Sequence, residues 1–401
     1  MSRRAPGARS LRLTRSGVLV LALALASGVA GWLLGQPELS ALAATSGLAL
    51  VAALWWVLAA PDSTEVQRAL LPARTRVGED VLVRLEITNR ARRRAPVQRI
   101  TERADVHGTV ELSLAPVPAG ASRDLTYRYP ARRRGLHRLG PASLSVEDPF
   151  GLIRSTRPRS RVDDLLVLPR TWPLGPLPGA SGGHSVDRRT PLPSRERHDD
   201  DLVSLRAYEP GDDLRRVHWR SSARQGRLVV RQHDPPWTRR TTVVLDVRRS
   251  CHDEGSFERA VSAAASVVEA AVARGDLIRL VTTDGTDSGV VGDEARRALI
   301  DQLATVSWRP DGSLAGVLDQ LARDPEGRIV VCTGALGGPA HAAVTASTRA
   351  WGRCVLVATG PASASGEPDP PALVRWTDGD LDVVWASATG GSPTRPAEVT
   401  G

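Results

Sequence analysis

Residues 206–231 bring arginine, acidic, histidine and tryptophan side chains together at close spacing. Guanidinium groups pair with carboxylates through two parallel hydrogen bonds, so Arg and Asp at these spacings can form a fixed polar network. Such a network can serve as a docking surface, as a structural staple or as part of a catalytic site. The residues selected from it are Arg206, Tyr208, Pro210, Gly211, Asp212, Asp213, Arg215, Arg216, His218, Trp219, Ser222 and Arg224.

Catalysis by this segment would centre on His218 as a general base, with Asp212 or Asp213 as its carboxylate partner. No nucleophile stands beside His218 at a specific spacing, since Ser221 and Ser222 are equally well explained as cap or turn residues. A phosphate-cradling glycine loop is also missing from the sequence. We therefore favour a staple or docking platform over catalysis, and a hydrolase stays as the alternative.

The local pattern predicts how the segment folds. Residues 209–212 read Glu-Pro-Gly-Asp, which suits a type II turn because Pro fixes one central φ and Gly supplies the positive φ that follows. Asp212 or Asp213 can then cap a short helix over 214–219. A turn at Gln225-Gly226 leads into a strand over 227–231.

The composition narrows the class of partner. The chain has 401 residues and a net charge of +9, and every one of its 53 basic residues is Arg. Together with abundant Ala, Gly, Pro and Val, this bias is typical of GC-rich codons, and the sequence lacks a basic aromatic surface for nucleic acid. Cys251, Cys332 and Cys354 have no metal-type spacing, and we expect small buried side chains in a reducing compartment.

Two uncharged apolar runs, 17–34 and 41–60, are each long enough to cross a hydrocarbon layer of about 30 Å. The linker between them, 35–40, carries no positive charge, whereas Arg residues precede the first run and follow the second. The positive-inside rule then predicts a two-pass plasma-membrane protein with both termini in the cytoplasm and Trp55 and Trp56 near an interface. A cleaved signal peptide is the alternative, but a second span follows at once without a convincing cleavage motif.

The rest of the chain divides into a β-rich part and an α/β part. Alternating strands over 65–170, punctuated by Pro and Gly, predict an antiparallel sandwich, with Phe150 as a plug in its core. From 241 onward, apolar strands alternate with helices, which predicts a mostly parallel sheet covered on both faces. The expected strands are 241–246, 277–282, 328–332 and 354–358, with an edge strand at 383–385.

The expected fold class is therefore α/β, with membrane helices and a sandwich-like module before the parallel sheet. The expected segments are a basic cytoplasmic N-terminus (1–16), a transmembrane helical hairpin (17–60), a β-rich module (65–170), a Pro/Gly-rich linker (171–198), the Arg/Asp segment (199–235), an α/β domain (240–386) and a disordered tail (387–401).

The run Tyr208-Glu-Pro-Gly-Asp-Asp-Leu-Arg-Arg-Val-His-Trp219, with Ser222-Ala-Arg224 and Leu228-Val-Val-Arg231, resembles the signature of a bacterial family, the domain of unknown function 58. Residues 133–141 and 148–152 and the paired N-terminal helices are also similar to that family. The resemblance implies a von Willebrand factor A-like (Rossmann-type) fold at the C-terminus. It also implies association with a MoxR-type AAA+ ATPase, often alongside a membrane transglutaminase-like protein.

Domains of this A type often hold Mg²⁺ with an Asp-x-Ser-x-Ser loop, a Thr from a later loop and a further Asp. Here the first loop reads Asp246-Val-Arg-Arg-Ser250, with Arg248 in place of a Ser, and Gly312-Ser313 could supply the hydroxyl of the second loop. The further acid is missing where Thr333-Gly334 follows a strand. A hard cation needs several oxygen ligands, so we expect a degenerate, metal-free site at Asp246, Ser250 and Ser313, with Asp246 paired to Arg248 or Arg249.

These observations favour a membrane-tethered cytoplasmic adaptor that is not an enzyme and uses no cofactor. It would present the A-like domain and the Arg/Asp segment to a protein partner, in particular the ATPase. Two alternatives remain open: a hydrolase that uses His218 with Asp212 or Asp213, and a structural envelope scaffold that acts through residues 65–170.

Overall fold

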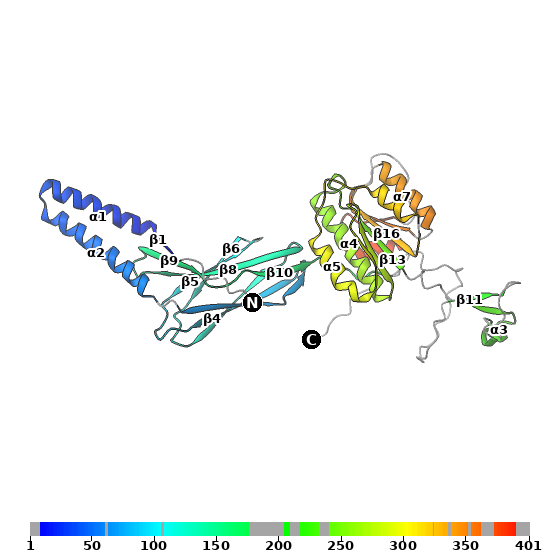
Figure 1. The fold of residues 1–401 in the computed structure, drawn as a ribbon, viewed down its shortest axis with the longest axis horizontal. Coiled ribbons are helices and arrows are strands. Elements are labelled where there is room, and N and C mark those ends of the chain that lie inside the picture. Colours follow the sequence, from blue (N-terminus) through cyan, green and yellow to red (C-terminus); the bar gives the residue numbers. More distant parts are fainter. Residues whose placement is uncertain are drawn as a thin grey trace. The chain divides into compact units, whose positions relative to one another are not determined.

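The computed structural model describes residues 9–60, 63–105, 108–175, 204–208, 217, 219–232, 240–323, 325–335, 338–351, 354–361 and 373–389. The chain forms two compact units, Met1–Leu168 and Pro169–Gly401. The first holds a helical hairpin and a β-sandwich, drawn in blue to cyan in Figure 1, and the second holds an α/β sheet, drawn in green to red.

Helices α1 (Arg15–Leu34) and α2 (Pro37–Ala59) form the hairpin. Both are long and apolar enough to cross a membrane, which agrees with the two expected runs. Gly35 ends α1 in the left-handed region with φ 64°, and Pro37 opens α2 at a position where its missing N–H costs nothing. The reversal between the helices therefore follows from the residues of the linker.

In the hairpin the large apolar side chains are exposed and the buried residues are mostly small, whereas a soluble helix pair buries its large apolar side chains. Most of the buried residues of the two helices are small, whereas Leu19, Trp32 and Trp55 are exposed by 71%, 82% and 69%. At Gly31 an added Cβ would lie 2.7 Å from Oγ of Ser40, so only glycine permits this close approach. Small residues at the contact and large apolar residues outside are typical of helices that pack in lipid. The buried positions are Gly17, Ser27, Gly31, Ser46, Ala53 and Val57.

The sandwich consists of two sheets that share one core. One sheet contains β2 (Thr64–Leu71), β4 (Asp80–Asn89) and β7 (Ser122–Pro130). The other contains β1 (Ser10–Leu13), β3 (Arg74–Arg76), β5 (Gln98–Ala104), β6 (Gly108–Leu114), β8 (Gly135–Glu147), β9 (Ile153–Pro158) and β10 (Asp163–Leu168). Alternate β4 residues such as Val83 and Leu85 are fully buried against the second sheet, as period-two alternation requires. The pairing is antiparallel except for β3 with β10.

The hairpin is joined to the sandwich at two places. Strand β1 precedes α1 directly and pairs with β9, so part of the expected basic N-terminus is a strand. The Thr14 hydroxyl accepts from Gly17 N at 3.0 Å, and Thr14 N donates to the Leu152 carbonyl at 2.9 Å. Val57 near the end of α2 packs with Leu152 and Ile153. These contacts fix the ends of both helices against one edge of the sandwich.

Phe150 does not fill the sandwich core, and the prediction that it does is wrong. Its side chain is 71% exposed in the turn between β8 and β9. The buried Asp148 carboxylate accepts from Phe150 N at 2.9 Å and from Ile153 N at 2.6 Å, which closes the turn and leaves Phe150 at its tip. Local side-chain-to-backbone bonding therefore decides its direction.

The six-stranded sheet of the second unit runs in the order β15-β14-β13-β16-β17-β18. All neighbours are parallel except the edge strand β15, which is antiparallel to β14. The strands are β13 (Arg240–Leu245), β14 (Leu277–Thr282), β15 (Asp287–Val291), β16 (Arg328–Thr333), β17 (Cys354–Ala358) and β18 (Leu373–Arg375). Strands β13, β14, β16 and β17 match the expected strands, whereas the sequence did not reveal β15 or β18.

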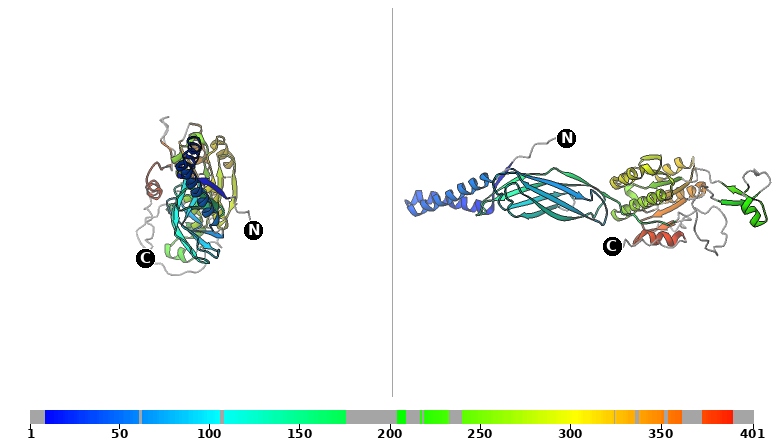
Figure 2. Two further views of the ribbon diagram at one scale, coloured as in Figure 1. Left: turned by 90° about the vertical axis from the view of Figure 1, so that its left-hand side faces the viewer. Right: turned by 90° about the horizontal axis from the view of Figure 1, so that it is seen from below.

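Helices cover both faces of this sheet, as the near-continuous apolar strands predict. Helices α4 (Glu254–Ala273) and α5 (Arg296–Thr305) contact each other on one side, and α6 (Leu314–Leu321) and α7 (Gly338–Trp351) share a core with the other face (Figures 1 and 2). Cys332 and Cys354 are buried and Cys251 is half-buried, all three as free thiols.

The expected edge strand at 383–385 is a helix, α8 (Leu381–Thr389), in which Trp385 is fully buried. A short run of Val and Trp cannot be told from one turn of a buried helix by periodicity alone. The first residues of the expected disordered tail, 387–389, belong to α8, and the remainder lies outside the described residues.

Candidate functional site

The topology of the parallel sheet marks one place as a candidate site. The chain leaves β13 toward β14 on one side and leaves β16 toward β17 on the other, so the strand order reverses between β13 and β16. Open α/β sheets bind their ligands at the carboxyl ends of the strands at such a reversal. Asp246 follows β13 there, and Thr333 ends β16.

The Asp246 carboxylate is fully buried and surrounded by donors. Arg248 donates from Nε to Oδ1 at 2.9 Å and from Nη2 to Oδ2 at 2.7 Å. The hydroxyls of Thr283 and Thr333 donate to Oδ1 at 3.2 Å and to Oδ2 at 2.8 Å. The Arg248 backbone N–H adds a further contact of 3.2 Å to Oδ1. A carboxylate offers about four lone-pair positions, so these donors occupy it completely.

The charges of this pair are fixed by their contacts. Burial acts to raise the pKa of Asp246, but the hydrogen bonds and charge of Arg248, with the Thr333 hydroxyl, hold it below its usual range. The pKa of Arg248 is raised by its hydrogen bond to Asp246, against the opposing effect of burial. Both groups are therefore ionised at neutral pH. The pairing of Asp246 with Arg248, one of two partners expected from the sequence, is present.

Cys251 and His252 approach Asp246 from a short 3₁₀ turn, Arg249–Cys251, and the residue after it. His252 Nε2 donates to the Asp246 carbonyl at 2.8 Å, and Cys251 Sγ donates to the Arg248 carbonyl at 3.2 Å. Burial lowers the pKa of His252. Burial and the nearby Asp246 charge raise the pKa of Cys251 to about 12. Both side chains are therefore neutral at pH 7, and the thiol is a poor nucleophile.

The donor set around Asp246 does not suit a metal ion. One potential ligand atom from each of Asp246, Cys251 and His252 lies within 4.8 Å of the others. The carboxylate is saturated by donors, the thiol is protonated, and the imidazole nitrogen that faces the cluster already donates its hydrogen. A hard cation such as Mg²⁺ would have to displace the Arg248 guanidinium from its site.

The two serines expected at this site do not contact Asp246. Ser313 caps α6 by accepting from Gly316 N at 3.0 Å, and Ser250 is exposed in the 3₁₀ turn. The hydroxyls that do contact Asp246 belong to Thr283 and Thr333, which the sequence reasoning missed. Each follows or ends an apolar strand that is parallel to β13. Strand-end position was the signal that could have identified them.

The rim of the site exposes an arginine stacked on an aromatic group. The guanidinium of Arg249 lies 5.4 Å from the ring centre of Trp308. Trp308 in turn lies 5.7 Å from Phe257, and Phe257 lies 5.3 Å from His252. The stack leads from the exposed Arg249 to the buried edge beside Asp246. Arg and Trp are enriched at the centres of protein interfaces.

Part of the Arg/Asp segment is described by the structure. Strand β11 (Ser204–Ala207), which carries Arg206, pairs with β12 (Val229–Gln232), and α3 (Trp219–Gln225) contacts β12. The helix expected over 214–219 is wrong in its position, because Val217 lies in a β-bridge and α3 starts at Trp219.

The selected residues of this segment have different surroundings. Ser222 is buried and its hydroxyl accepts from Val229 N at 2.9 Å, which makes it a structural staple. Tyr208 is half-buried, Arg224 is exposed, and Trp219 is 65% exposed. The predicted residues that lie outside the described part of the chain are Pro210, Gly211, Asp212, Asp213, Arg215, Arg216 and His218.

Comparison with solved structures gives matches of low overall similarity. One is the CARDB domain of a Pyrococcus furiosus protein, which is 11% identical, covers 26% of this chain and 90% of that chain, and has a TM-score of 0.19. Another is the alkylpurine DNA glycosylase AlkC of Pseudomonas fluorescens, which is 14% identical, covers 38% of this chain and 44% of that chain, and has a TM-score of 0.22. These scores carry no argument about fold or activity.

Comparison with curated proteins and with protein families gives two matches, and the family match lies in the second unit. The uncharacterized protein YeaD of Bacillus subtilis (strain 168) is 26% identical over 162 residues, which span 38% of this chain and 38% of that relative. Residues 204–347 match the family model described as "Protein of unknown function DUF58". The described β11–β12 pair and the α/β sheet as far as α7 are therefore the part of the chain that is similar to this family.

Proposed function

We propose that this protein is a membrane-anchored cytoplasmic adaptor that presents the α/β unit and the Arg/Asp segment to a protein partner. The observation that carries the proposal is the set of side chains at the carboxyl ends of β13 and β16, where open α/β sheets bind ligands. There Arg248 neutralises Asp246, and Arg249 stacks on Trp308 at the rim. Such an edge offers little to a small substrate or a cation, but it has the chemistry of a protein interface.

Membrane anchorage is supported by the surface of the helical hairpin. Large apolar side chains such as Leu25 and Leu48 are exposed by 62% and 68%, and this surface would be costly in water. Trp32 lies near the turn between the helices, and Trp55 and Trp56 lie near the opposite end, as interfacial anchors do. Arg residues flank the ends that join the sandwich, which favours a two-pass topology with both termini in the cytoplasm.

The strand order and the position of Asp246 support a von Willebrand factor A-like assignment for the α/β unit. The sheet places Asp246 at the end of its first strand, where A-type domains carry the first acid of their metal loop. With Arg248 in that loop, the edge would act through protein contacts without a metal. The partner favoured by the family resemblance is a MoxR-type AAA+ ATPase, with a membrane transglutaminase-like protein as a further member of the assembly.

Affinity purification from detergent-solubilised native membranes tests the adaptor role. The tagged full-length protein should recover an AAA+ ATPase, identified by mass spectrometry. Arg249→Ala and Trp308→Ala should lose it, whereas Arg297→Ala, which removes an exposed Arg from α5, should retain it. Arg216→Ala and Asp213→Ala test the Arg/Asp segment in the same assay. Recovery with every folded variant would remove both surfaces as docking sites, and absence of the ATPase from the wild type would contradict the proposal.

A further inference from the structure

The turn between β8 and β9, residues 148–152, presents a large apolar side chain at the end of the sandwich that carries the hairpin. Phe150 is one of only two Phe residues in the chain, and its side chain is 71% exposed. The two hydrogen bonds from the backbone to the buried Asp148 carboxylate hold it at the tip of the turn. A lone exposed Phe needs no explanation, so the surroundings of the β8–β9 turn decide what Phe150 contacts.

The residues that follow Phe150 pack against the sides of both apolar helices. Leu152 and Ile153 share a buried cluster with Ala53 of α2, and part of α1 packs against the same cluster through Val20. An added Cβ at Gly17 would overlap the Leu152 carbonyl oxygen, so the first turn of α1 touches the β8–β9 turn directly. These helix residues all belong to the two uncharged apolar runs. The sandwich therefore meets the helices within their apolar parts.

The packing of α1 against α2 gives the level of this contact. The glycine contacts that define the antiparallel register are Gly31 with Ser40 and Gly28 with Ala43. Continued along the helices, this register brings Arg15, the first residue of α1, to the level of Trp56. Trp is enriched at membrane interfaces and Arg flanks the cytoplasmic ends of spans, so this level fits the headgroup layer. Gly17 and Val20 lie about 3 and 8 Å farther along α1, on the side of the acyl chains.

Strand β1 adds two exposed apolar side chains beside the β8–β9 turn. Leu13 pairs with Ile153 of β9, and β1 leads directly into α1. Leu11 and Leu13 are both exposed, and alternate residues of a strand face the same side, so they lie on one face of β1. Pro149, exposed in the turn, lines a cavity together with Trp56. Exposed apolar side chains from β1, the turn and α2 thus lie around the base of the hairpin.

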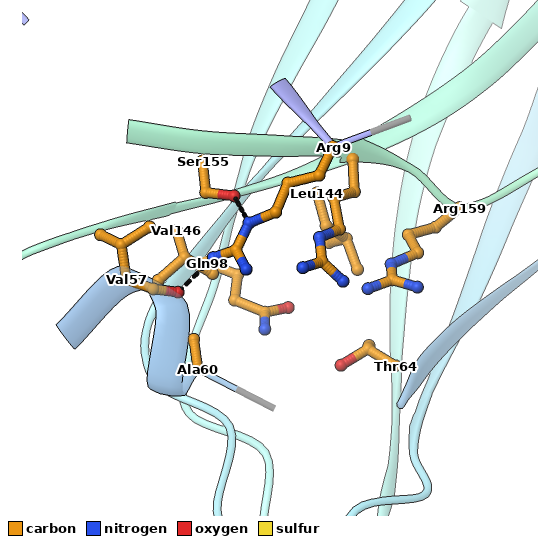
Figure 3. A pocket seen from close by; sticks show the side chains of 10 residues that line it. Arg9, Val57, Ala60, Thr64, Gln98, Leu144, Val146, Ser155 and Arg159 are labelled. Carbon is orange, nitrogen blue, oxygen red and sulfur yellow. Dashed lines mark hydrogen bonds between the residues drawn. The ribbon is translucent and has the colours of Figure 1, made fainter. Parts of the chain in front are cut away.

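The junction is held at a second point by Arg9, which precedes β1 (Figure 3). Its Nε donates to Ser155 Oγ on β9 at 2.7 Å, and its Nη2 donates to the Val57 carbonyl in the last turn of α2. Thr14 joins the start of α1 to the β8–β9 turn, because its backbone N–H donates to the Leu152 carbonyl at 2.9 Å. Both helices are therefore bonded to the β9 edge, which fixes the level of the turn against them.

The charges near the β8–β9 turn are compatible with a lipid surface. The Asp148 carboxylate is buried and accepts two backbone hydrogen bonds. Glu147 pairs with Arg154. Arg12 and Arg15 are exposed at the same end of the unit and would attract anionic headgroups.

We propose that the β8–β9 turn and β1 contact the lipid bilayer, with Phe150 at the boundary between headgroups and acyl chains. The bilayer is the partner that fits, because the turn adjoins helix surfaces whose large exposed side chains are apolar. The inference rests on the membrane anchorage in the proposed function. The sandwich would then lie against the membrane surface through contacts of its own, in addition to its link to the hairpin.

Site-directed spin labelling of the full-length protein in proteoliposomes of phosphatidylglycerol and phosphatidylcholine tests the proposal. Collisions with O₂, which concentrates in lipid, and with a nickel chelate, which stays in water, report the depth of a nitroxide. The label on Phe150→Cys should lie about 5–10 Å inside the headgroup layer, the depth of apolar faces at membrane interfaces. Leu136→Cys is the matched control, because Leu136 is 51% exposed near the opposite end of β8 and its label should be open to nickel. Protein without an added cysteine gives the background, since the three native thiols are buried or half-buried.

Two results would overturn the lipid contact. Equal access of nickel to Phe150→Cys and Leu136→Cys would place the β8–β9 turn in water. Shielding of Phe150→Cys from both O₂ and nickel would mean that protein, in place of lipid, covers the turn.

A third label separates this inference from the membrane anchorage. Leu25→Cys replaces an exposed side chain in the middle of α1 and should be deep in the bilayer, with frequent O₂ collisions and almost none with nickel. A deep Leu25→Cys label with a water-exposed Phe150→Cys label would contradict the contact of the turn alone. Nickel access to Leu25→Cys would contradict the anchorage, and the contact of the turn would fail with it.

Discussion

A carboxylate buried at the end of the first strand of a parallel sheet needs a counter-charge, and Arg248 supplies one from two residues away. The side chain of Asp246 is fully buried, and that of Arg248 is 21% exposed. Of this ion pair, only the Arg248 side chain is partly accessible to solvent. Removing the cation from such a pair leaves a buried charge uncompensated.

Arg248→Ser should therefore lower the free energy of unfolding by about 3 kcal/mol. Arg249→Ser is the matched control, because it removes an exposed guanidinium over Trp308 and should cost less than about 1 kcal/mol. Thermal unfolding of the full-length protein in detergent measures both. Addition of Mg²⁺ should not shift the wild-type midpoint. A saturable Mg²⁺ shift that disappears in Asp246→Ala would contradict the metal-free interpretation.

His252 makes the stability of this edge sensitive to pH. Its pKa is lowered in the folded protein by burial, whereas the unfolded chain has a value of about 6.5. As pH falls below about 6.5 the unfolded state takes up the proton more readily, so stability should fall in that window. His252→Gln keeps a donor for the Asp246 carbonyl and should remove this part of the pH dependence. Unfolding midpoints between pH 7.5 and 5 measure the effect, and identical slopes for both proteins would refute it.

At this scale the sequence was informative only where partners are neighbours in the chain. The pairing of Asp246 with Arg248 could be expected from a separation of two residues. The hydroxyls of Thr283 and Thr333 reach Asp246 because three strands align in register, and no local pattern encodes that alignment. Phe150 misled the prediction because an Asp148 turn, rather than hydrophobicity, sets its direction.

At the scale of elements, the hairpin depends on the close approach of two helices at small residues. An added Cβ at Gly31 meets the backbone N of Ser40 at 2.8 Å, whereas one at Gly47 of α2 meets nothing within 4 Å. The two glycines therefore offer a matched pair, one at the helix contact and one on an open face. Their comparison separates helix packing from the general effect of a larger side chain.

Gly31→Leu should force α1 and α2 apart and lower the stability of the hairpin by about 1–3 kcal/mol, the cost of overpacking a tight contact. Gly47→Leu adds the same side chain and should be tolerated. Size-exclusion chromatography of heated, detergent-solubilised protein gives the temperature at which each variant is lost. Equal loss of both variants would show that the contact at Gly31 does not hold the helices together.

Whether a helix or strand could be predicted from the sequence depended on its length and on how much of it is apolar. The strands β13, β14, β16 and β17 are visible because burial on both faces leaves near-continuous apolar runs. The two long helices are visible because each is an uncharged apolar run of membrane-spanning length. The edge strand β15 and the short β18 lack that signal, and α8 was mistaken for a strand because its apolar run is only a few residues long. The Arg/Asp segment gave a strong motif, but most of its selected residues lie outside the described part of the chain, so its predicted geometry stays a prediction.

At the scale of the whole molecule, the proposed membrane anchorage would make the two apolar helices set the side of the membrane on which the other parts of the chain lie. The described residues contain two candidate spans, α1 and α2. Strand β1 precedes α1, and the rest of the sandwich and the second unit follow α2. An even number of spans returns the chain to its starting side. Arg9 and Arg12 precede α1 and Arg15 is its first residue, so the positive-inside rule favours the cytoplasm for that side in the proposed topology.

Cysteine labelling of intact spheroplasts should show this topology. Gln36→Cys lies in the turn between the helices and should react with a membrane-impermeant thiol reagent from outside. Val97→Cys, at a position that is 62% exposed in the sandwich, should react only after lysis. The native thiols contribute little background, because Cys332 and Cys354 are buried and Cys251 has a pKa raised to about 12 by burial and nearby charge. Labelling of Val97→Cys in intact cells would place the sandwich outside, where no cytoplasmic ATPase could reach the rest of the chain, and the adaptor proposal would fail with it.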